Sequence, residues 1–152
     1  MTWLSFGPHT EHPGALRVDV LPIADVVADI RNLRRFGNGT FEGVEAFHIL
    51  EHLLPEDAPL ALAECWRILQ AGGVLEAAVP DMAECARTLL KGDLEILKNI
   101  YSPSDVLPLQ HRWGYTRKSL AELLTSAGFV DLRWLPGHPS DPHEMRVRVC
   151  KP

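Results

Sequence analysis

The chain has 152 residues, of which 46% are hydrophobic and 23% are charged. This length and composition fit a globular protein with a core of its own, and we expect a single domain over residues 1–152. Fifteen Lys and Arg residues against 20 Asp and Glu residues give a net charge of −5. That balance argues against a general nucleic-acid binder and against a polybasic membrane anchor.

The cysteines and the N-terminal residues indicate in which cellular compartment the protein is expected. Cys65, Cys85 and Cys150 are widely spaced and form no C-x-x-C pair, so neither a zinc ribbon nor a thioredoxin-like site is indicated. Residues 1–7 lack the basic and apolar regions of a signal peptide. No apolar run approaches the ~20 residues of a membrane span. We therefore expect a cytoplasmic protein.

Seven short strands and three longer helices are expected in chain order. The strands are read from β-rich or alternating apolar runs: 3–6, 16–20, 26–28, 44–47, 73–79, 130–135 and 145–150. The helices are read from apolar residues at helical spacing: 56–70, 82–90 and 119–127. In the first helix, Asp57 is the expected cap and Gly72-Gly73 the expected stop. Its expected buried face consists of Leu62, Cys65, Trp66 and Leu69.

This order predicts an α/β protein with a doubly wound, mostly parallel seven-stranded sheet and helices on both faces. Only the loop 136–144 separates the last two strands, so the C-terminal pair must be antiparallel. The segment between the first two strands is too short for a full helix, so the fold is shortened at its N-terminus. We expect the sheet surface left bare there to be apolar and to favour a homodimer.

Three groups of residues carry a family resemblance. The first is 17–20 with 26–30, the second is 47–52 with 63–73 and 79–81, and the third is 111–115 with 120–129. Together they resemble the class I S-adenosylmethionine (SAM) dependent methyltransferases, and most closely short type 11-like predicted methyltransferases of bacteria. The resemblance implies a Rossmann-like methyltransferase fold, SAM as the cofactor and a small-molecule acceptor.

The resemblance also implies a cofactor site beyond the carboxyl ends of the strands, where doubly wound sheets bind ligands. Asp19 would accept the ribose hydroxyls, with a turn cap as its alternative role. Asp29 and Ile30 would contact the adenine, with a solvated turn residue and a core residue as their alternatives. The full set of expected cofactor-binding residues is Gly7, His9, Asp19, Val20, Asp29, Ile30, His48, Glu51 and His52.

The loop after the first strand departs from the family's glycine-rich pattern. Gly7 matches the first glycine, but His9 stands where the second is expected, and Pro8 removes one backbone donor. Two alternatives follow. Either the loop binds SAM in an altered way, with His9 or His12 near the methionine carboxylate, or SAM binding is lost.

Methyl transfer needs alignment above all, and a general base helps when the acceptor is a hydroxyl or an amine. The candidate catalytic residues are His48, Asp81 and His111. The segment 102–110 is expected to be irregular and to cover an acceptor pocket. His48-x-x-Glu51-His52 also matches the H-x-x-E-H pattern of inverted zinc peptidases, but it follows a strand, so no metal is expected.

The sequence therefore leaves two alternative hypotheses about function. The leading hypothesis is SAM-dependent methyl transfer to a small-molecule or glycan-type acceptor. The alternative is a catalytically inactive methyltransferase-like domain that acts as a binding or assembly partner, as the altered loop at Gly7 would allow.

Overall fold

The computed structural model describes residues 2–7 and 10–152. Its strands are β1 (Trp3–Phe6), β2 (Leu16–Asp19), β3 (Val26–Val27), β4 (Phe41–Phe47), β5 (Leu69–Pro80), β6 (Val130–Leu135) and β7 (Glu144–Cys150). Its helices are α1 (Ala58–Ile68), α2 (Met82–Leu90), α3 (Leu97–Tyr101) and α4 (Arg117–Ser126), with short 3-10 turns η1 (Leu50–His52), η2 (Leu94–Ile96) and η3 (Leu107–Leu109). Within the described part of the chain, none of these helices has the length and hydropathy of a membrane span.

The seven strands form one sheet in the order β3-β2-β1-β4-β5-β7-β6. β1 to β5 pair in parallel, whereas β7 runs antiparallel to both β5 and β6. Only a loop joins β6 to β7, and a loop of that length permits an antiparallel return alone. The expected fold class, an α/β fold with a mostly parallel seven-stranded sheet and an antiparallel C-terminal strand, is confirmed.

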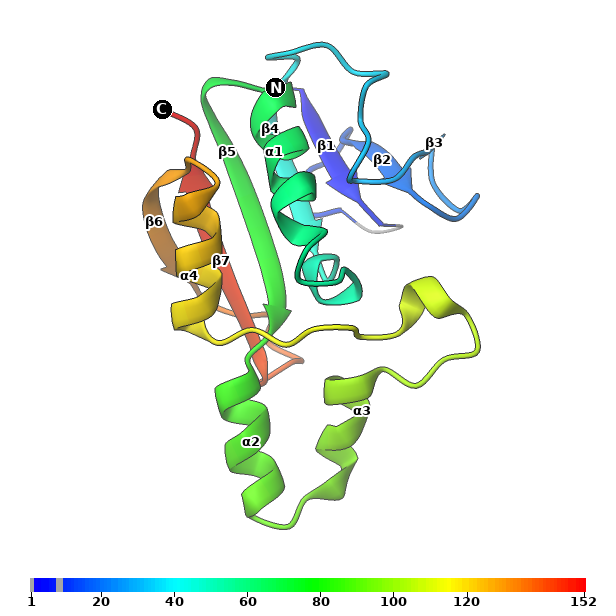
Figure 1. The fold of residues 1–152 in the computed structure, drawn as a ribbon, viewed down its shortest axis with the longest axis vertical. Helices are drawn as coiled ribbons and strands as arrows, with labels where there is room; N and C mark the ends of the chain where they lie inside the picture. Colours follow the sequence, from blue (N-terminus) through cyan, green and yellow to red (C-terminus); the bar gives the residue numbers. More distant parts are fainter. Residues whose placement is uncertain (1, 8–9) are drawn as a thin grey trace.

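The core lies between the sheet and the helices α1 and α4 (Figure 1). Alternate strand residues point to this side, among them Leu4, Val44 and Leu75, each fully buried. Leu62 of α1 and Leu120 of α4 meet them from the helices and are equally buried. Strand alternation and helical spacing thus converge on one apolar layer.

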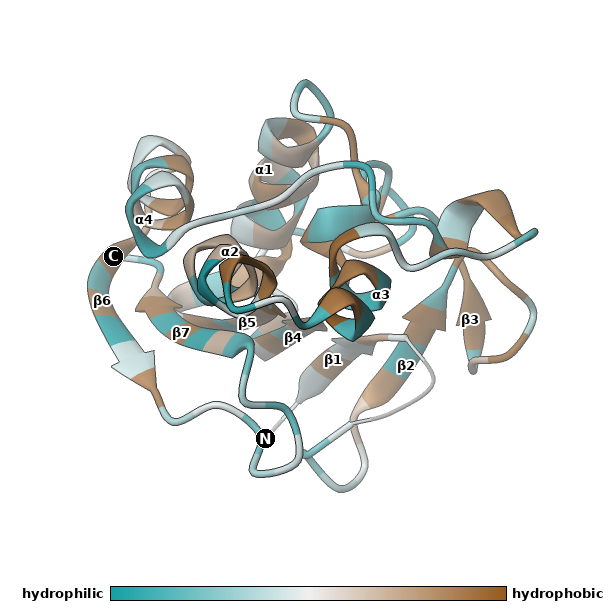
Figure 2. Cartoon of the chain, turned by 90° about the horizontal axis from the view of Figure 1, so that it is seen from below, coloured by the Kyte–Doolittle hydropathy of each residue, from teal (hydrophilic) through white to brown (hydrophobic). Residues whose placement is uncertain are grey.

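Helices cover only one face of the sheet. Figure 2 shows α1 and α4 on the same side, and among the described residues only loops lie on the other. The expectation of helices on both faces was wrong in this respect. The connections from β1 to β2, residues 7–15, and from β2 to β3, residues 20–25, are too short for a packed helix.

The helix-free face of the sheet is polar, not apolar as expected. Side chains in register form one row across six strands, and the row reads Arg17, Ser5, Glu45, Glu76, Arg148 and Arg133. Because this row takes the place of apolar residues, the bare face needs no partner to hide it from water. The homodimer was predicted from an apolar face. It therefore loses that argument and remains a prediction.

The expected boundaries of the first long helix need correction. α1 ends at Ile68, before Gly72-Gly73, because Leu69 already pairs with Phe41 and begins β5. Asp57 occupies the N-cap position, but its side chain caps nothing and instead binds Arg31.

Three further details of the elements differ from expectation. Trp66 was expected to be buried but is 36% exposed, beneath the ammonium of Lys151. β4 begins at Phe41, three residues earlier than expected. The short helix α3 was not expected at all.

Gly43 of β4 leaves room for an aromatic ring. A Cβ at this position would lie 2.4 Å from ring atoms of Trp3 on the neighbouring strand β1. Gly43→Ala should lower the free energy of unfolding by about 1–3 kcal/mol, because a packed core resists added volume. Urea denaturation measures the loss.

The matched test for Gly43 is a double variant. In a Trp3→Leu background the ring is gone, so the same Gly43→Ala change should cost clearly less than in the native background. Equal costs in the two backgrounds would contradict the steric explanation.

Candidate functional site

A cavity of about 860 Å³ opens at the carboxyl ends of β1, β2 and β4. Gly7 follows β1, Asp19 ends β2 and His48 follows β4, and all three line the cavity. β7 runs antiparallel, so its amino end, Glu144, reaches the same edge and lines the cavity too. This is the edge where doubly wound sheets bind ligands.

Most of the residues expected to bind the cofactor come together in this cavity. The expected residues in its lining are Gly7, Asp19, Val20, Asp29, Ile30, His48 and His52. Glu51 is buried next to the lining but is not part of it. His9 lies outside the described residues, so its expected role has no structural test.

Asp19 fixes the turn after β2 and also lines the cavity. Its Oδ1 accepts the backbone N–H of Leu21 at 2.8 Å, so it does fix the turn after β2. The same residue lines the cavity. The turn bond therefore holds the carboxylate in place instead of withdrawing it from a ligand.

Asp29 belongs to a charged network at the rim of the cavity. The guanidinium of Arg31 binds Asp29 at 2.6 Å and Asp57 at 2.8 Å. The hydrogen bonds from Arg31 lower the pKa of Asp29 below its usual range. Arg31 and Asp57 are 26 positions apart, so only the folded chain brings this pair together.

His48 lies between two carboxylates. Its Nε2 is 2.8 Å from Glu144 and its Nδ1 is 3.1 Å from Glu51. The hydrogen bond to Glu144, followed by that to Glu51, raises the pKa of His48 to about 10. At neutral pH the ring is therefore a cation with both nitrogens engaged. This geometry fits a positioning role and not that of a general base.

The backbone of His48 is unusual as well. Its φ of 53° lies in the left-handed region, which residues other than glycine seldom adopt. The ring's two ion pairs and the bond from its N–H to the Ala78 carbonyl, 2.8 Å, hold this conformation. Such strain collects at functional sites, which agrees with the position of His48 in the cavity wall.

The other two candidate catalytic residues lie outside the cavity lining. Asp81 is the N-cap of α2, and its side chain accepts the N–H of Ala83 at 2.9 Å. His111 is largely buried, and burial lowers its pKa, so its ring is neutral at pH 7. Its ring packs edge-on against His52, with the ring centroids 4.9 Å apart.

Two further segments, η3 and the loop before β7, also contribute to the cavity wall. Leu107, Pro108 and Leu109 of η3 line the cavity, as the expected cover over 102–110 implied. His138, Ser140 and Asp141, before β7, were missed. Recognising that the amino end of an antiparallel strand shares the functional edge would have found them.

Comparison with known proteins agrees with this geometry. Residues 11–77 match a family model described as a methyltransferase domain. A SAM-dependent methyltransferase from Archaeoglobus fulgidus superimposes with a TM-score of 0.71 at 17% identity, over 99% of this chain and 86% of that one. Residues 11–77 are thus similar to a methyltransferase family, and the whole chain has the fold of SAM-dependent methyltransferases. The family resemblance of the sequence is thereby confirmed.

Two further methyltransferase structures show the same fold. One from Thermotoga maritima has a TM-score of 0.67 at 18% identity, covering 99% of this chain and 82% of that one. The Burkholderia thailandensis 1,6-didemethyltoxoflavin-N1-methyltransferase, with bound substrate and S-adenosylhomocysteine, has a TM-score of 0.65 at 18% identity, covering 99% and 70%. No curated protein matches the sequence. The family match and this fold support SAM as the cofactor.

Proposed function

We propose that this methyltransferase transfers a methyl group from SAM to a small-molecule or glycan-type acceptor. The observation that carries the proposal is the cavity of about 860 Å³ with Asp19 in its wall, at the edge where this fold binds ligands. Its volume lies within the usual range for cofactor and small-ligand sites. SAM supplies the reactive methyl group, and the chain's residues supply binding and alignment.

The cofactor end of the cavity is formed by the first two strands. We assign the ribose hydroxyls to the carboxylate of Asp19, which its bond to Leu21 holds in place. Asp29 and Ile30 offer a polar and an apolar surface for the adenine, with Arg31 fixing the carboxylate of Asp29. Gly7 has a φ of 94°, which lets the chain turn sharply at the end of β1.

The acceptor end of the cavity is formed by η3 and the segment before β7. The apolar side chains of Leu107 and Leu109 face polar ones from Ser140 and Asp141 in the same lining. Such a mixture suits an acceptor that is partly apolar and carries a hydroxyl or an amine. The small substrate bound by the Burkholderia enzyme supports the same class.

The inactive alternative finds no support in these comparisons, since the similar proteins are methyltransferases. The inactive alternative was based on the altered loop at Pro8-His9, and these two residues lie outside the described part of the chain. Gly7 itself, which matches the first glycine of the family pattern, has a positive φ that favours glycine. We therefore retain the enzyme as the proposed function.

Calorimetric titration of the purified full chain with SAM, and separately with S-adenosylhomocysteine, tests the proposal. We expect one site with a dissociation constant in the micromolar range for at least one of the two. Measurable binding would justify a screen of small acceptors. If the folded protein gives no heat with millimolar ligand, the proposed function is wrong and the cavity serves another ligand.

A further inference from the structure

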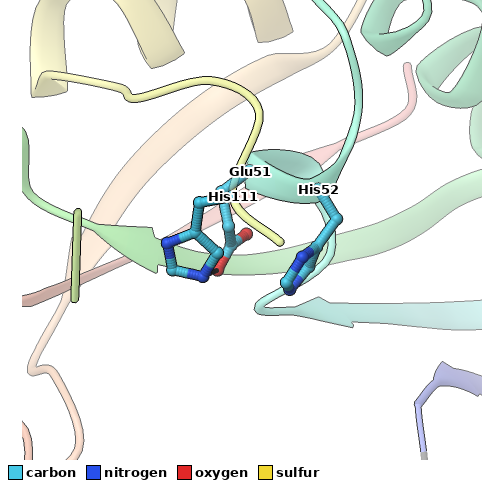
Figure 3. Close-up of side chains that lie close together, drawn as sticks. All are labelled: Glu51, His52 and His111. Carbon is cyan, nitrogen blue, oxygen red and sulfur yellow. Dashed lines mark ion pairs between the residues drawn. The ribbon is translucent and has the colours of Figure 1, made fainter. Parts of the chain in front are cut away.

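Three potential metal ligands meet beside the cofactor cavity. Glu51 and His52 belong to η1, and His111 follows η3 (Figure 3). One ligand atom from each side chain lies within 4.8 Å of the other two. The backbone N–H groups of Arg112 and Trp113 both donate to the carbonyl of Glu51, at 2.7 and 3.1 Å, and so hold His111 beside η1.

Both histidines are oriented as metal ligands usually are. Nδ1 of His52 is 3.0 Å from the carbonyl of Gln110, and Nδ1 of His111 is 2.7 Å from the carbonyl of Asn99. A carbonyl oxygen only accepts, so each Nδ1 carries the proton and donates it. In the neutral ring this leaves each Nε2 with a free lone pair. Metal-bound histidines typically have such an outer hydrogen bond.

Glu51 provides an independent sign of a ligand. The residue is 1% exposed, and its Oε2 has no hydrogen-bond partner among the described residues. A buried carboxylate oxygen without a partner is costly and rare. Its other oxygen, Oε1, accepts from Nδ1 of His48 at 3.1 Å, which fixes the carboxylate in the way ligating carboxylates are fixed.

The contact between His111 and Glu51 is not a hydrogen bond. The His111 Nε2 lies 3.9 Å from Oε1 of Glu51, too far for a hydrogen bond that would otherwise explain the contact.

We propose that Glu51, His52 and His111 bind one divalent transition-metal ion, with Zn²⁺ as the preferred ion. Two imidazole nitrogens and one carboxylate form a common zinc ligand set, whereas Mg²⁺ prefers oxygen ligands alone. Two ligands of a tetrahedral Zn²⁺ at about 2.1 Å from the ion stand about 3.4 Å apart, so ligand atoms up to 4.8 Å apart must draw together by up to about 1.4 Å. Rotations of the side chains can supply that movement.

The site differs from the zinc-peptidase pattern that the sequence suggested. His48 is engaged with Glu144 and is not a ligand, while His111 comes from a loop distant in sequence. Three protein ligands leave a further coordination position, and His52 also lines the cavity. A water or an acceptor oxygen in the cavity would take that position. The metal site stands independently of the proposed function.

Titration of untagged, chelator-treated full chain with Zn²⁺ tests the site. Calorimetry should show one Zn²⁺ bound with a micromolar or tighter dissociation constant and no comparable binding of Mg²⁺. Co²⁺ in the same site should show visible absorption bands of a nitrogen- and oxygen-bound ion. Glu51→Gln and His111→Ala should each weaken Zn²⁺ binding at least tenfold.

The matched control is His143→Ala, because His143 binds Thr88 and lies outside the cluster. That variant should bind Zn²⁺ as the native protein does. The proposal is overturned if the folded native protein binds no Zn²⁺, or if Glu51→Gln and His111→Ala bind it as well as His143→Ala does. Should His111→Ala fail to fold, the nearly isosteric Glu51→Gln decides. Because no SAM is present, the outcome is separable from that of the cofactor titration.

Discussion

Asp19→Ala is expected to weaken binding of S-adenosylhomocysteine by about 10- to 100-fold, with the fold retained. Asp19 lines the cavity at the end of β2, and the N–H of Leu21 holds its Oδ1 at 2.8 Å. A hydrogen bond between a charged group and a neutral one contributes about 1.5–3 kcal/mol, which corresponds to that change in affinity. Calorimetry measures the affinity, and circular dichroism checks the fold.

Two further variants separate the charge of Asp19 from its place in the turn. Asp19→Asn keeps an oxygen for the Leu21 N–H but loses the charge, so its affinity should fall between those of native protein and Asp19→Ala. Asp25→Ala breaks only an exposed pair with Arg17 and should leave the affinity unchanged. Native affinity in a folded Asp19→Ala protein would remove Asp19 from the cofactor site.

The sequence predicted the strands and their order well because the signals are local. Alternation in 145–150 and the short loop before it were enough to place β7 antiparallel to its neighbour. The positions of Asp19 and Asp29 after two strands were enough to place both in one cavity, since parallel strands end at a common edge.

What the sequence could not predict depends on contacts between distant residues. His48 and Glu144 are 96 positions apart, and their pairing requires the amino end of β7 to reach the edge where β4 ends. His111 comes to Glu51 only because the chain after η3 bonds to the Glu51 carbonyl. No spacing in the sequence encodes either contact. The prediction of a general base at His48 and the prediction of no metal site were therefore made without these two contacts.

The helix-free face of the sheet also depends on contacts that the sequence could not predict. No pattern in the sequence distinguished Glu45 or Glu76, yet both are almost fully buried. Thr10 and the backbone N–H of Glu11 bind Glu45, and the carboxylate of Glu11 binds Arg146, the partner of Glu76. On this face, paired charges cover the sheet where a packed helix covers it on the other. We therefore expect these pairs to contribute to the stability of the sheet.

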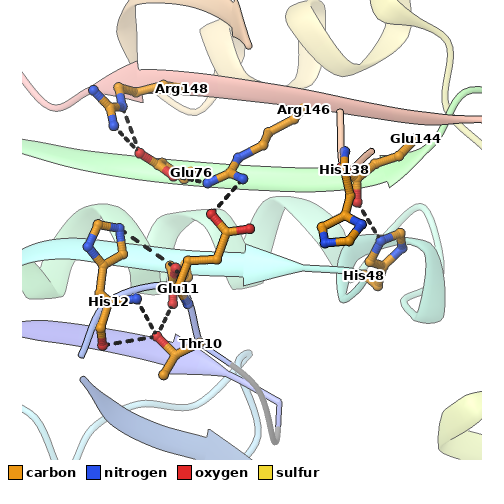
Figure 4. Close-up of polar contacts among 10 residues, drawn as sticks. Thr10, Glu11, His12, His48, Glu76, His138, Glu144, Arg146 and Arg148 are labelled. Atoms are coloured by element: carbon orange, nitrogen blue, oxygen red, sulfur yellow. Dashed lines mark hydrogen bonds and ion pairs between the residues drawn. The ribbon is translucent and has the colours of Figure 1, made fainter. Parts of the chain in front are cut away.

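Glu76→Gln is accordingly expected to cause a large loss of stability, about 2–3 kcal/mol. Glu76 is 1% exposed and binds Arg146 at 2.6 Å and Arg148 at 2.8 Å (Figure 4). Removing one member of a buried ion pair leaves the other charges uncompensated. We expect a smaller loss than for a fully buried pair, because Arg148 is 44% exposed and Arg146 keeps its pair with Glu11. Urea denaturation at neutral pH measures the loss.

The dependence of that loss on pH distinguishes a charge effect from a packing effect. Burial alone would raise the pKa of Glu76, but hydrogen bonds from Arg146 and Arg148 outweigh it and lower the pKa. The unfolded chain therefore takes up the proton first, and this contribution to stability fades as the pH falls below about 4.3. The difference between native protein and Glu76→Gln should shrink from about pH 6 to about pH 3.

A control on the surface isolates the effect of burial at Glu76. Glu84→Gln removes the same charge from an exposed pair with Arg87 and should change the free energy of unfolding by less than about 0.5 kcal/mol. A difference for Glu76→Gln that stays constant down to about pH 3 would mean that shape and not charge is lost. In that case the sheet would tolerate the polar row without being stabilised by its charges.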